Sequence, residues 1–296
     1  DIEAQRFRVR TDVRQRFFEA LAAQKRMALA LEFQEVAEKG VQIAYERLEG
    51  LEGSQPDVLQ AEIQLNEVEL IARQAQLDFE GAWSELTAIV GLPDLEPSKL
   101  SGTLPSEASP REMESTYQQL LGASPELQAA YTLVQRACAN IRRQDVQAIP
   151  NLTAQLGVAH DNATGDEFAS IRLGIPLPIH NRNQGNESAA YAEYARATHE
   201  VQRVQMSLRA RLARAMREYS LARAAVDRYR EEILPRAEEN LRLSETAHLA
   251  GQFDFLRVLV ARRAFFDANL KYVQAQADLA VSNAAFDGLL LSDVLS

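Results

Sequence analysis

The chain has 296 residues, 46% of them hydrophobic, and a formal net charge of −10. This acidic balance, with no basic stripe to displace counterions, excludes a nucleic-acid partner. No segment reaches the ~20 consecutive apolar residues that a membrane-spanning helix needs. The single cysteine, Cys138, excludes an intramolecular disulfide framework.

A helical segment occurs twice in the chain, with a shift of 200 positions. Asp-Val-Leu-Gln-Ala at 57–61 returns as Arg-Val-Leu-Val-Ala at 257–261. Both copies end near a Gly-Leu pair, which begins at Gly91 in the first copy and at Gly288 in the second. The period is too long for a solenoid, so the repeat predicts two large helical halves around a central element.

The first half is predicted to be a helical hairpin. Residues 2–49 lack proline and are rich in Ala, Leu, Glu, Gln and Arg, which predicts one long helix. A cluster of turn residues that includes Gly50, Gly53 and Pro56 follows it. The second helix is expected over 57–90, and two long helices with so short a connection pack antiparallel.

The region between the first half and the centre is expected to hold a loop and two helix starts. Residues 93–110 are rich in Pro, Ser and Gly and are expected to be a loop. Ser-Pro-Arg-Glu at 109–112 has the pattern of a capping box and predicts a helix start. Ser-Pro-Glu-Leu at 124–127 predicts another, with a helix that continues to about residue 148.

The central element is predicted to be a β-hairpin. Apolar residues alternate with polar or small ones over 151–159 and again over 168–178. This pattern also fits a half-buried hairpin of a soluble sheet. Because the sequence offers no partner strand and a lone hairpin is marginal in water, we favour a membrane hairpin. Gln155 and Arg172 would then face a barrel lumen. The face expected to meet lipid carries Leu152, Leu156, Val158, Ile171, Leu173 and Ile175.

The second half is expected to repeat the first. Residues 187–249 are helical in composition, with Pro235 inside the segment, and Gly251 marks the second long turn. The last helix is expected over 253–286. The repeat places the turn at Gly251 and the turn over 50–56 at the same height.

Candidate catalytic or metal-binding chemistry is sparse. The four histidines lie far apart without a cysteine nearby, so no metal site is expected. No nucleophile–base pair or phosphate-binding glycine loop is present, so neither an enzyme nor a cofactor is expected. Acidic helix residues such as Glu62 and Glu67 are interpreted as solvated faces or, alternatively, as the lining of a water-filled interior that favours cations.

The order helix, tip, helix, β-hairpin and a second helical pair resembles the TolC-type outer membrane efflux family, closest to its heavy-metal and cation branch. The resemblance covers essentially the whole chain. Five local strings carry it: Ser-Pro-Glu-Leu at 124–127, Ile-Pro-Asn-Leu at 149–152, Ile-Pro-Leu-Pro at 175–178, Asn-Arg-Asn-Gln-Gly-Asn at 181–186 and Ile-Leu-Pro at 233–235.

The resemblance implies a mainly α fold, with long antiparallel helical hairpins that form a periplasmic α-barrel. A membrane β-hairpin would contribute to a trimeric β-barrel. The implied protein is a homotrimer of the outer membrane that extends into the periplasm. It would serve as a passive exit duct that opens at its periplasmic tip. Its partners would be a periplasmic adaptor protein and an inner-membrane pump. The alternative is a soluble, elongated coiled-coil scaffold or adaptor.

The Asn-Arg-Asn-Gln-Gly turn and the acidic balance favour heavy-metal or monovalent cations over drugs as cargo. Family members have two β-hairpins, so the first hairpin and a leading helix would lie upstream of Asp1. The tip or gate is assigned to Gly50, Gly53, Pro56, Asp57, Gly251 and Arg257. Asp57 and Arg257 occupy equivalent positions and are expected to pair, between hairpins or between subunits, as a weak latch.

The expected segments are 1–92 for the first-repeat helical hairpin, 93–124 for an equatorial segment, 125–149 for a helix, 150–180 for the transmembrane β-hairpin and 186–291 for the second-repeat helical hairpin.

Overall fold

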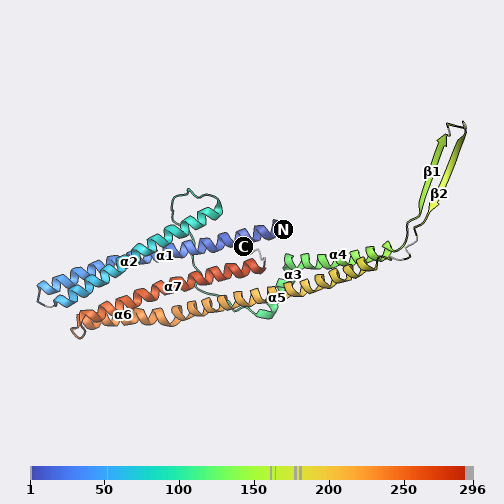
Figure 1. Cartoon of the computed structure of the whole chain (residues 1–296). Coiled ribbons are helices and arrows are strands. Elements are labelled where there is room, and N and C mark those ends of the chain that lie inside the picture. The colour runs from blue at the N-terminus through green and yellow to red at the C-terminus, as the bar shows by residue number, and fades with distance from the viewer. Residues whose placement is uncertain are drawn as a thin grey trace. The chain divides into compact units, whose positions relative to one another are not determined.

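The structure is a computed structural model that describes residues 2–51, 53–160, 162–163, 165–176, 179 and 182–290. It divides into two compact units (Figure 1). The first, here called the repeat unit, comprises Asp1–Ala123 and Ala210–Ser296. The second, the hairpin unit, comprises Ser124–Arg209.

The repeat unit contains the long helices. Its first part holds α1 (Ile2–Glu49), α2 (Gln55–Val90) and α3 (Met113–Ala123). Its second part begins within α5 (Gln184–Arg228) and continues through a π-helical turn, η1 (Tyr229–Ile233), into α6 (Leu234–Leu249) and α7 (Phe255–Leu290). The hairpin unit holds α4 (Pro125–Gln147), β1 (Thr153–His160), β2 (Glu167–Gly174) and the first part of α5.

The repeat seen in the sequence is a repeat of helices. Helices α2 and α7 begin at Gln55 and Phe255, which are 200 positions apart. Within the repeat unit, the α1–α2 turn and the α6–α7 turn lie at the same end (Figure 1). The expected fold class, mainly α with long antiparallel helical hairpins and a β-hairpin, is confirmed.

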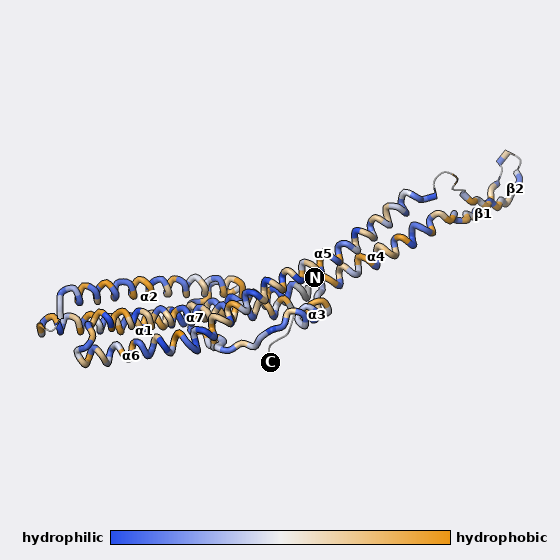
Figure 2. The backbone as a smooth tube through the Cα atoms, turned by 90° about the horizontal axis from the view of Figure 1, so that it is seen from below, coloured by the Kyte–Doolittle hydropathy of each residue, from blue (hydrophilic) through white to orange (hydrophobic). Residues whose placement is uncertain are grey.

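Helix α1 packs against both copies of the repeated helix. Hydrophobic and hydrophilic residues alternate along these helices (Figure 2), so the core is a series of small clusters. The cluster nearest the turns joins α1, α2 and α7, and small side chains on α1 let the helices approach closely. Its buried members are Ala44, Val58, Ala61, Phe255 and Leu259. A second cluster holds Ala30, Val68, Ala72, Ala75 and Phe266.

Pro235 explains the π-helical turn. Proline has no N–H group, and its ring clashes with the carbonyl four residues earlier, so it cannot sit in an undisturbed α-helix interior. The extra residue of a π-turn accommodates this disturbance. In η1 the N–H of Leu234 reaches the carbonyl of Tyr229, five residues back. The two helices on either side remain continuous through the turn.

The predicted helix start at 109 is wrong. Helix α3 begins at Met113, and residues 109–112 belong to an extended segment whose groups bond to other helices. The start at Ser124 is confirmed, because the Ser124 hydroxyl accepts a hydrogen bond from the Leu127 N–H at 3.3 Å. No helix in the described part of the chain is long and apolar enough to cross a membrane.

The two Gly-Leu pairs near the repeat ends have different roles. Gly91 caps α2 in the left-handed conformation, with φ of 80°. Gly288 lies inside α7, where a Cβ atom would come within 2.2 Å of the Thr11 hydroxyl. Gly91 therefore ends a helix, whereas Gly288 allows α1 and α7 to approach each other closely.

Gly288 and Gly40 provide a matched pair of substitutions. Gly288→Ala should destabilise the repeat unit by about 1–3 kcal/mol, because Thr11 must move to admit the new methyl group. Gly40→Ala should stabilise it by about 0.5–1 kcal/mol, because the nearest atom, Arg262 Nη1, is 3.9 Å away. Thermal unfolding and hydrogen exchange of both variants would measure the difference. Equal stability of the two variants would contradict this packing.

Candidate functional site

The first tip turn depends on close backbone approach at Gly53. Its N–H donates to the Arg47 carbonyl at 3.0 Å, and a Cβ atom would lie 3.1 Å from the Cβ of Arg47. The N–H of Gly50 donates to the Glu46 carbonyl at 3.0 Å, which continues the α1 hydrogen-bond ladder into the turn. Of the two glycines, Gly53 is the one that a larger residue cannot replace without movement.

The start of α2 is capped locally. Pro56 lies in the first turn, where its missing N–H has no helical partner in any case. Asp57 accepts hydrogen bonds from the Ser54 N–H at 2.9 Å and from the Ser54 hydroxyl at 2.7 Å. These residues therefore position the helix start.

The second tip turn has a glycine where the first has a leucine. Gly251 takes a φ of 73°, and its N–H donates to the His248 carbonyl at 2.9 Å. Leu51, at the equivalent position of the first copy, has a φ of 58° and is 93% exposed. We did not predict Leu51 as a tip residue, although the shift of 200 positions pairs it with Gly251.

The expected pairing of Asp57 with Arg257 does not form within the described chain. Asp57 is bonded to Ser54, and the guanidinium of Arg257 lies over the Phe253 ring, 4.7 Å from its centroid. Local partners three or four residues away engage both side chains. The latch expected between these two residues is therefore not present inside one chain.

A different pair of residues joins the two turns. The Arg47 guanidinium, in the last turn of α1, contacts Nε2 of His248, in the last turn of α6. The other ring nitrogen, Nδ1, lies 2.9 Å from the carbonyl oxygen of Phe253. The His248 ring also contacts the ring of Phe255, with centroids 5.6 Å apart.

The β-hairpin is antiparallel, and its strands differ slightly from those expected. They span 153–160 and 167–174, where we expected 151–159 and 168–178. Leu152 and Ile175 consequently flank the strands, and residues 177–178 lie outside the described part of the chain.

The register of the hairpin separates an apolar face from a polar one. Leu156 pairs with Ile171, and Leu173 pairs with Ala154 on the same face as Val158. Gln155 pairs with Arg172 on the opposite face. Six apolar side chains in or beside the strands are 58–84% exposed: Leu152, Leu156, Val158, Ile171, Leu173 and Ile175.

The Asn-rich turn after the hairpin joins α4 to α5. Asn183 has a φ of 67°, a left-handed conformation that Asn tolerates better than most residues. Its side-chain amide donates to the Gln144 carbonyl at 3.0 Å and to Gln147 Oε1 at 3.3 Å. Its own carbonyl accepts the Glu187 N–H near the start of α5 at 3.0 Å. The turn thus has a structural role, which weakens the inference of a cation cargo from this motif.

Residues 93–112 form an extended segment that we call the strap. One end is fixed to α2 and α1. The indole N–H of Trp83 donates to the Leu95 carbonyl at 2.8 Å. The Gln24 side chain makes two hydrogen bonds with the backbone of Leu100, at 2.7 and 3.1 Å.

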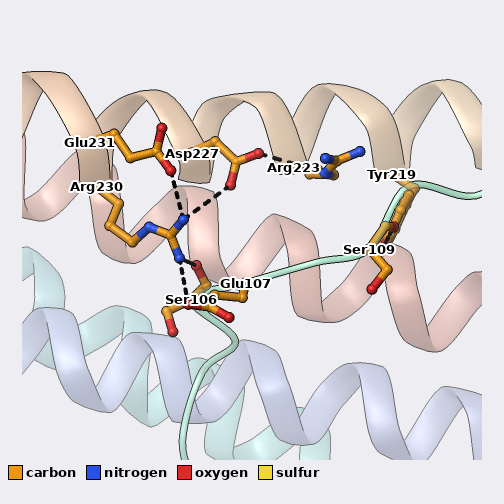
Figure 3. A network of polar contacts seen from close by, with 8 residues as sticks. All are labelled: Ser106, Glu107, Ser109, Tyr219, Arg223, Asp227, Arg230 and Glu231. Atoms are coloured by element: carbon orange, nitrogen blue, oxygen red, sulfur yellow. Dashed lines mark hydrogen bonds and ion pairs between the residues drawn. The ribbon is translucent and has the colours of Figure 1, made fainter.

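Further along, the strap meets α5 and the π-helical turn (Figure 3). Arg230 of η1 donates to the Ser106 carbonyl at 2.9 Å and to Glu107 at 3.0 Å. Its hydrogen bond to Glu231 raises the pKa of Arg230, which keeps the guanidinium charged. The hydroxyl of Tyr219 donates to the Ser109 carbonyl at 2.8 Å.

The strap ends against α7. Arg111 donates to Asn283 at 2.6 Å and to the buried carboxylate of Asp287 at 3.2 Å. The same guanidinium lies over the rings of Tyr219 and Phe286, 5.0 and 4.2 Å from their centroids. The strap therefore connects α1, α2, α5, η1 and α7 through hydrogen bonds from both its backbone and its side chains.

The acidic helix residues singled out in the sequence have partners between helices. Glu62 of α2 accepts a hydrogen bond from Tyr45 of α1 at 2.5 Å, which raises the pKa of Tyr45. Glu67 of α2 accepts one from Arg263 of α7 at 3.0 Å. Within the described residues, no cluster of His, Cys, Asp or Glu could hold a metal ion.

Long antiparallel helical hairpins joined to an exposed apolar β-hairpin define a membrane-attached helical protein. The family model described as "Outer membrane efflux protein" matches residues 116–290, more than half of the chain. The chain belongs to the outer membrane efflux protein family. It is a protein of the outer membrane that extends into the periplasm. This assignment decides against the soluble scaffold considered as an alternative.

Named relatives agree with this assignment. The cobalt-zinc-cadmium resistance protein CzcC of Cupriavidus metallidurans is 30% identical over 265 residues, which cover 90% of this chain and 63% of CzcC. The outer membrane efflux protein BepC of Brucella suis is 28% identical over 301 residues, which cover 95% of this chain and 64% of BepC. The chain thus spans just under two thirds of both proteins.

Solved structures share the fold. The Neisseria gonorrhoeae MtrE outer membrane channel, solved in its open state, superposes with a TM-score of 0.73 at 20% identity. The match covers 97% of this chain and 67% of the MtrE chain.

Leu51 and Gly251 allow a reciprocal test of the tip turns. Leu51→Gly should stabilise the first turn by about 0.5–1 kcal/mol, because a left-handed conformation costs a non-glycine residue about 1–2 kcal/mol. Gly251→Leu should destabilise the second turn by a similar amount, and no neighbouring atom adds a clash. Hydrogen exchange of the turn amides would report both changes. The same direction of change in both variants would contradict the equivalence of the turns.

Proposed function

We propose that this protein is the exit duct of a tripartite efflux system in the outer membrane. Three copies would form one passive channel, with the β-hairpins in the lipid and the helices in the periplasm. A periplasmic adaptor protein and an inner-membrane pump would engage the helical tip. The observation that carries the proposal is membership of the outer membrane efflux family together with the exposed apolar hairpin.

The hairpin supports an assembly of several copies. Two strands leave open edges, and each unpaired backbone group costs several kcal/mol in hydrocarbon. A closed barrel needs further strands from other copies or from a longer chain. Leu156 and Val158, each 84% exposed, would then meet lipid, while Gln155 and Arg172 would face the lumen.

The repeat supports a ring of helical hairpins. Leu259 is buried against α1 within the chain, whereas its equivalent on α2, Leu59, is 49% exposed. A second equivalent pair shows the same difference, because Ala277 of α7 is buried and Leu77 of α2 is exposed. The shift of 200 positions makes α6 the equivalent of the end of α1. If α2 packs on a neighbouring copy as α7 packs on α1, then α2 contacts α6 of that copy. A contact of this head-to-tail kind closes into a ring when the rotation allows it.

The tip supports gating at the two turns. Both turns lie at one end of the repeat unit. The nearest buried cluster is the one that contains Ala61 and Phe255. Gly50, Gly53, Pro56, Asp57, Gly251 and Arg257 would form the rim of the channel, and the adaptor would separate neighbouring hairpins to open it.

Heavy-metal cations are the proposed cargo. The support is the 30% identity with CzcC, whose name describes resistance to cobalt, zinc and cadmium. The acidic balance of the chain favours cations in a water-filled interior.

The ring predicts a specific cross-link. Within the chain, Val41 of α1 packs against the cluster that holds Leu259 of α7. The equivalent contact between copies joins Leu241 to Leu59. In a Cys138→Ser background, Leu59→Cys with Leu241→Cys should give an oxidation ladder that stops at three subunits on a denaturing gel. Leu221→Cys, an exposed position on α5, serves with Leu59→Cys as the control pair and should stay monomeric.

A ladder that stops at two subunits, or equal cross-linking of the control pair, would contradict the trimeric ring. The trimer in planar bilayers should also conduct ions without an energy source.

Cargo can be tested in cells that carry the cognate pump and adaptor. Deletion of this protein should lower resistance to cobalt, zinc and cadmium and leave resistance to an uncharged drug unchanged. Re-expression should restore the metal resistance. If the deletion sensitises cells to the drug and not to the metals, the metal cargo is wrong while the duct remains.

A further inference from the structure

The contacts of His248 assign a different hydrogen-bonding role to each nitrogen of its ring. A carbonyl oxygen only accepts hydrogen bonds, so Nδ1 of His248 must carry the hydrogen that faces Phe253. A guanidinium only donates, so Nε2 must present its lone pair to Arg47. The observed arrangement is therefore compatible only with a neutral imidazole in one tautomer.

We propose that Arg47 and His248 form a pH-sensitive latch between the two tip turns. The latch is closed while His248 is neutral and opens when the ring is protonated. It rests on the proposed function in one respect, namely that the two turns form the gate of the duct.

The direction of the pH effect follows from the contact. Protonation places a hydrogen on Nε2, so that a donor faces a donor and two positive charges meet. Histidine is the side chain that changes its charge between pH 5 and pH 8. The latch is therefore present at the higher pH and is lost as the pH falls.

Other charged groups lie on the helices that carry the contact. On α6, Glu245 accepts hydrogen bonds from Arg262 of α7, at 2.9 and 3.2 Å. The charged residues close to Arg47 and His248 in the sequence of α1, α6, α7 and the second turn are Glu46, Glu49, Glu245, Asp254 and Arg257.

Release of the latch can loosen the turns without unpacking the helices. The buried cluster of Ala44, Val58, Ala61, Phe255 and Leu259 is entirely apolar, so its packing does not depend on pH. Each turn also keeps its own backbone hydrogen bonds, which involve no titratable side chain. The Arg47–His248 contact is thus the pH-dependent connection between two separately stable turns.

The test measures the distance between the turns in the full protein. Spin labels on Leu51→Cys and Leu249→Cys, both highly exposed positions, are introduced in the Cys138→Ser background. When the pH falls from 8 to 5, the population with the longer distance should rise at least tenfold relative to the population with the shorter distance. His248→Gln should abolish this change, because the glutamine oxygen accepts from Arg47 at either pH.

Two further variants complete the design. Arg47→Gln removes the fixed charge and should also abolish the pH-dependent change. His199→Gln is the matched control: His199 lies on α5, 3.4 Å from Gln202, and its loss should leave the wild-type change intact.

A constant distance in the wild type, or a pH-dependent distance that persists in His248→Gln and Arg47→Gln, would overturn the latch. Conductance is recorded separately. A pH-dependent distance without conductance at any pH leaves the latch standing and refutes the duct. Conductance with a constant distance supports the duct and refutes the latch.

Discussion

The packing of α1 against both α2 and α7 is the contact on which the remaining structure depends. A long helical hairpin has more apolar surface than its two helices can cover, so one helix must serve two neighbours. Alanines such as Ala30 and Ala44 allow this, because a small side chain lets a second helix approach closely. Since α7 rests on α1, the two turns meet at one end, and the contact between Arg47 and His248 becomes possible.

Much of the fold could be predicted from the sequence, because local signals determine it. Gly53, Pro56 and Gly251 mark the ends of long helical segments, and alternation of apolar residues marks the strands. The strap was expected to be a loop, but its path could not be predicted. Its hydrogen bonds reach Tyr219 and Arg230, more than 100 residues away, and no local pattern records such partners. The helix expected at 109 was wrong for the same reason.

The candidate site was predictable in position but less so in its contacts. Asp57 and Arg257 were correctly placed at the two turns, yet each has a neighbour three or four residues away as its partner. A nearby partner costs less conformational entropy than one 200 residues away, which a comparison of the two copies overlooks. Leu51 was missed because leucine gives no turn signal, and only its alignment with Gly251 reveals the left-handed backbone.

The equal spacing of the two repeated helices from their turns restricts how this protein can change during evolution. Each residue of an α-helix adds 1.5 Å of length and turns the following side chains by 100°. A single deletion in α2 alone would lower one turn below the other and rotate Val58 away from Ala44. Insertions and deletions in the two copies are therefore tolerated only in matched pairs, or in multiples of about seven residues that restore the same face. The two copies of the repeated helix therefore keep a common spacing even where their side chains have diverged.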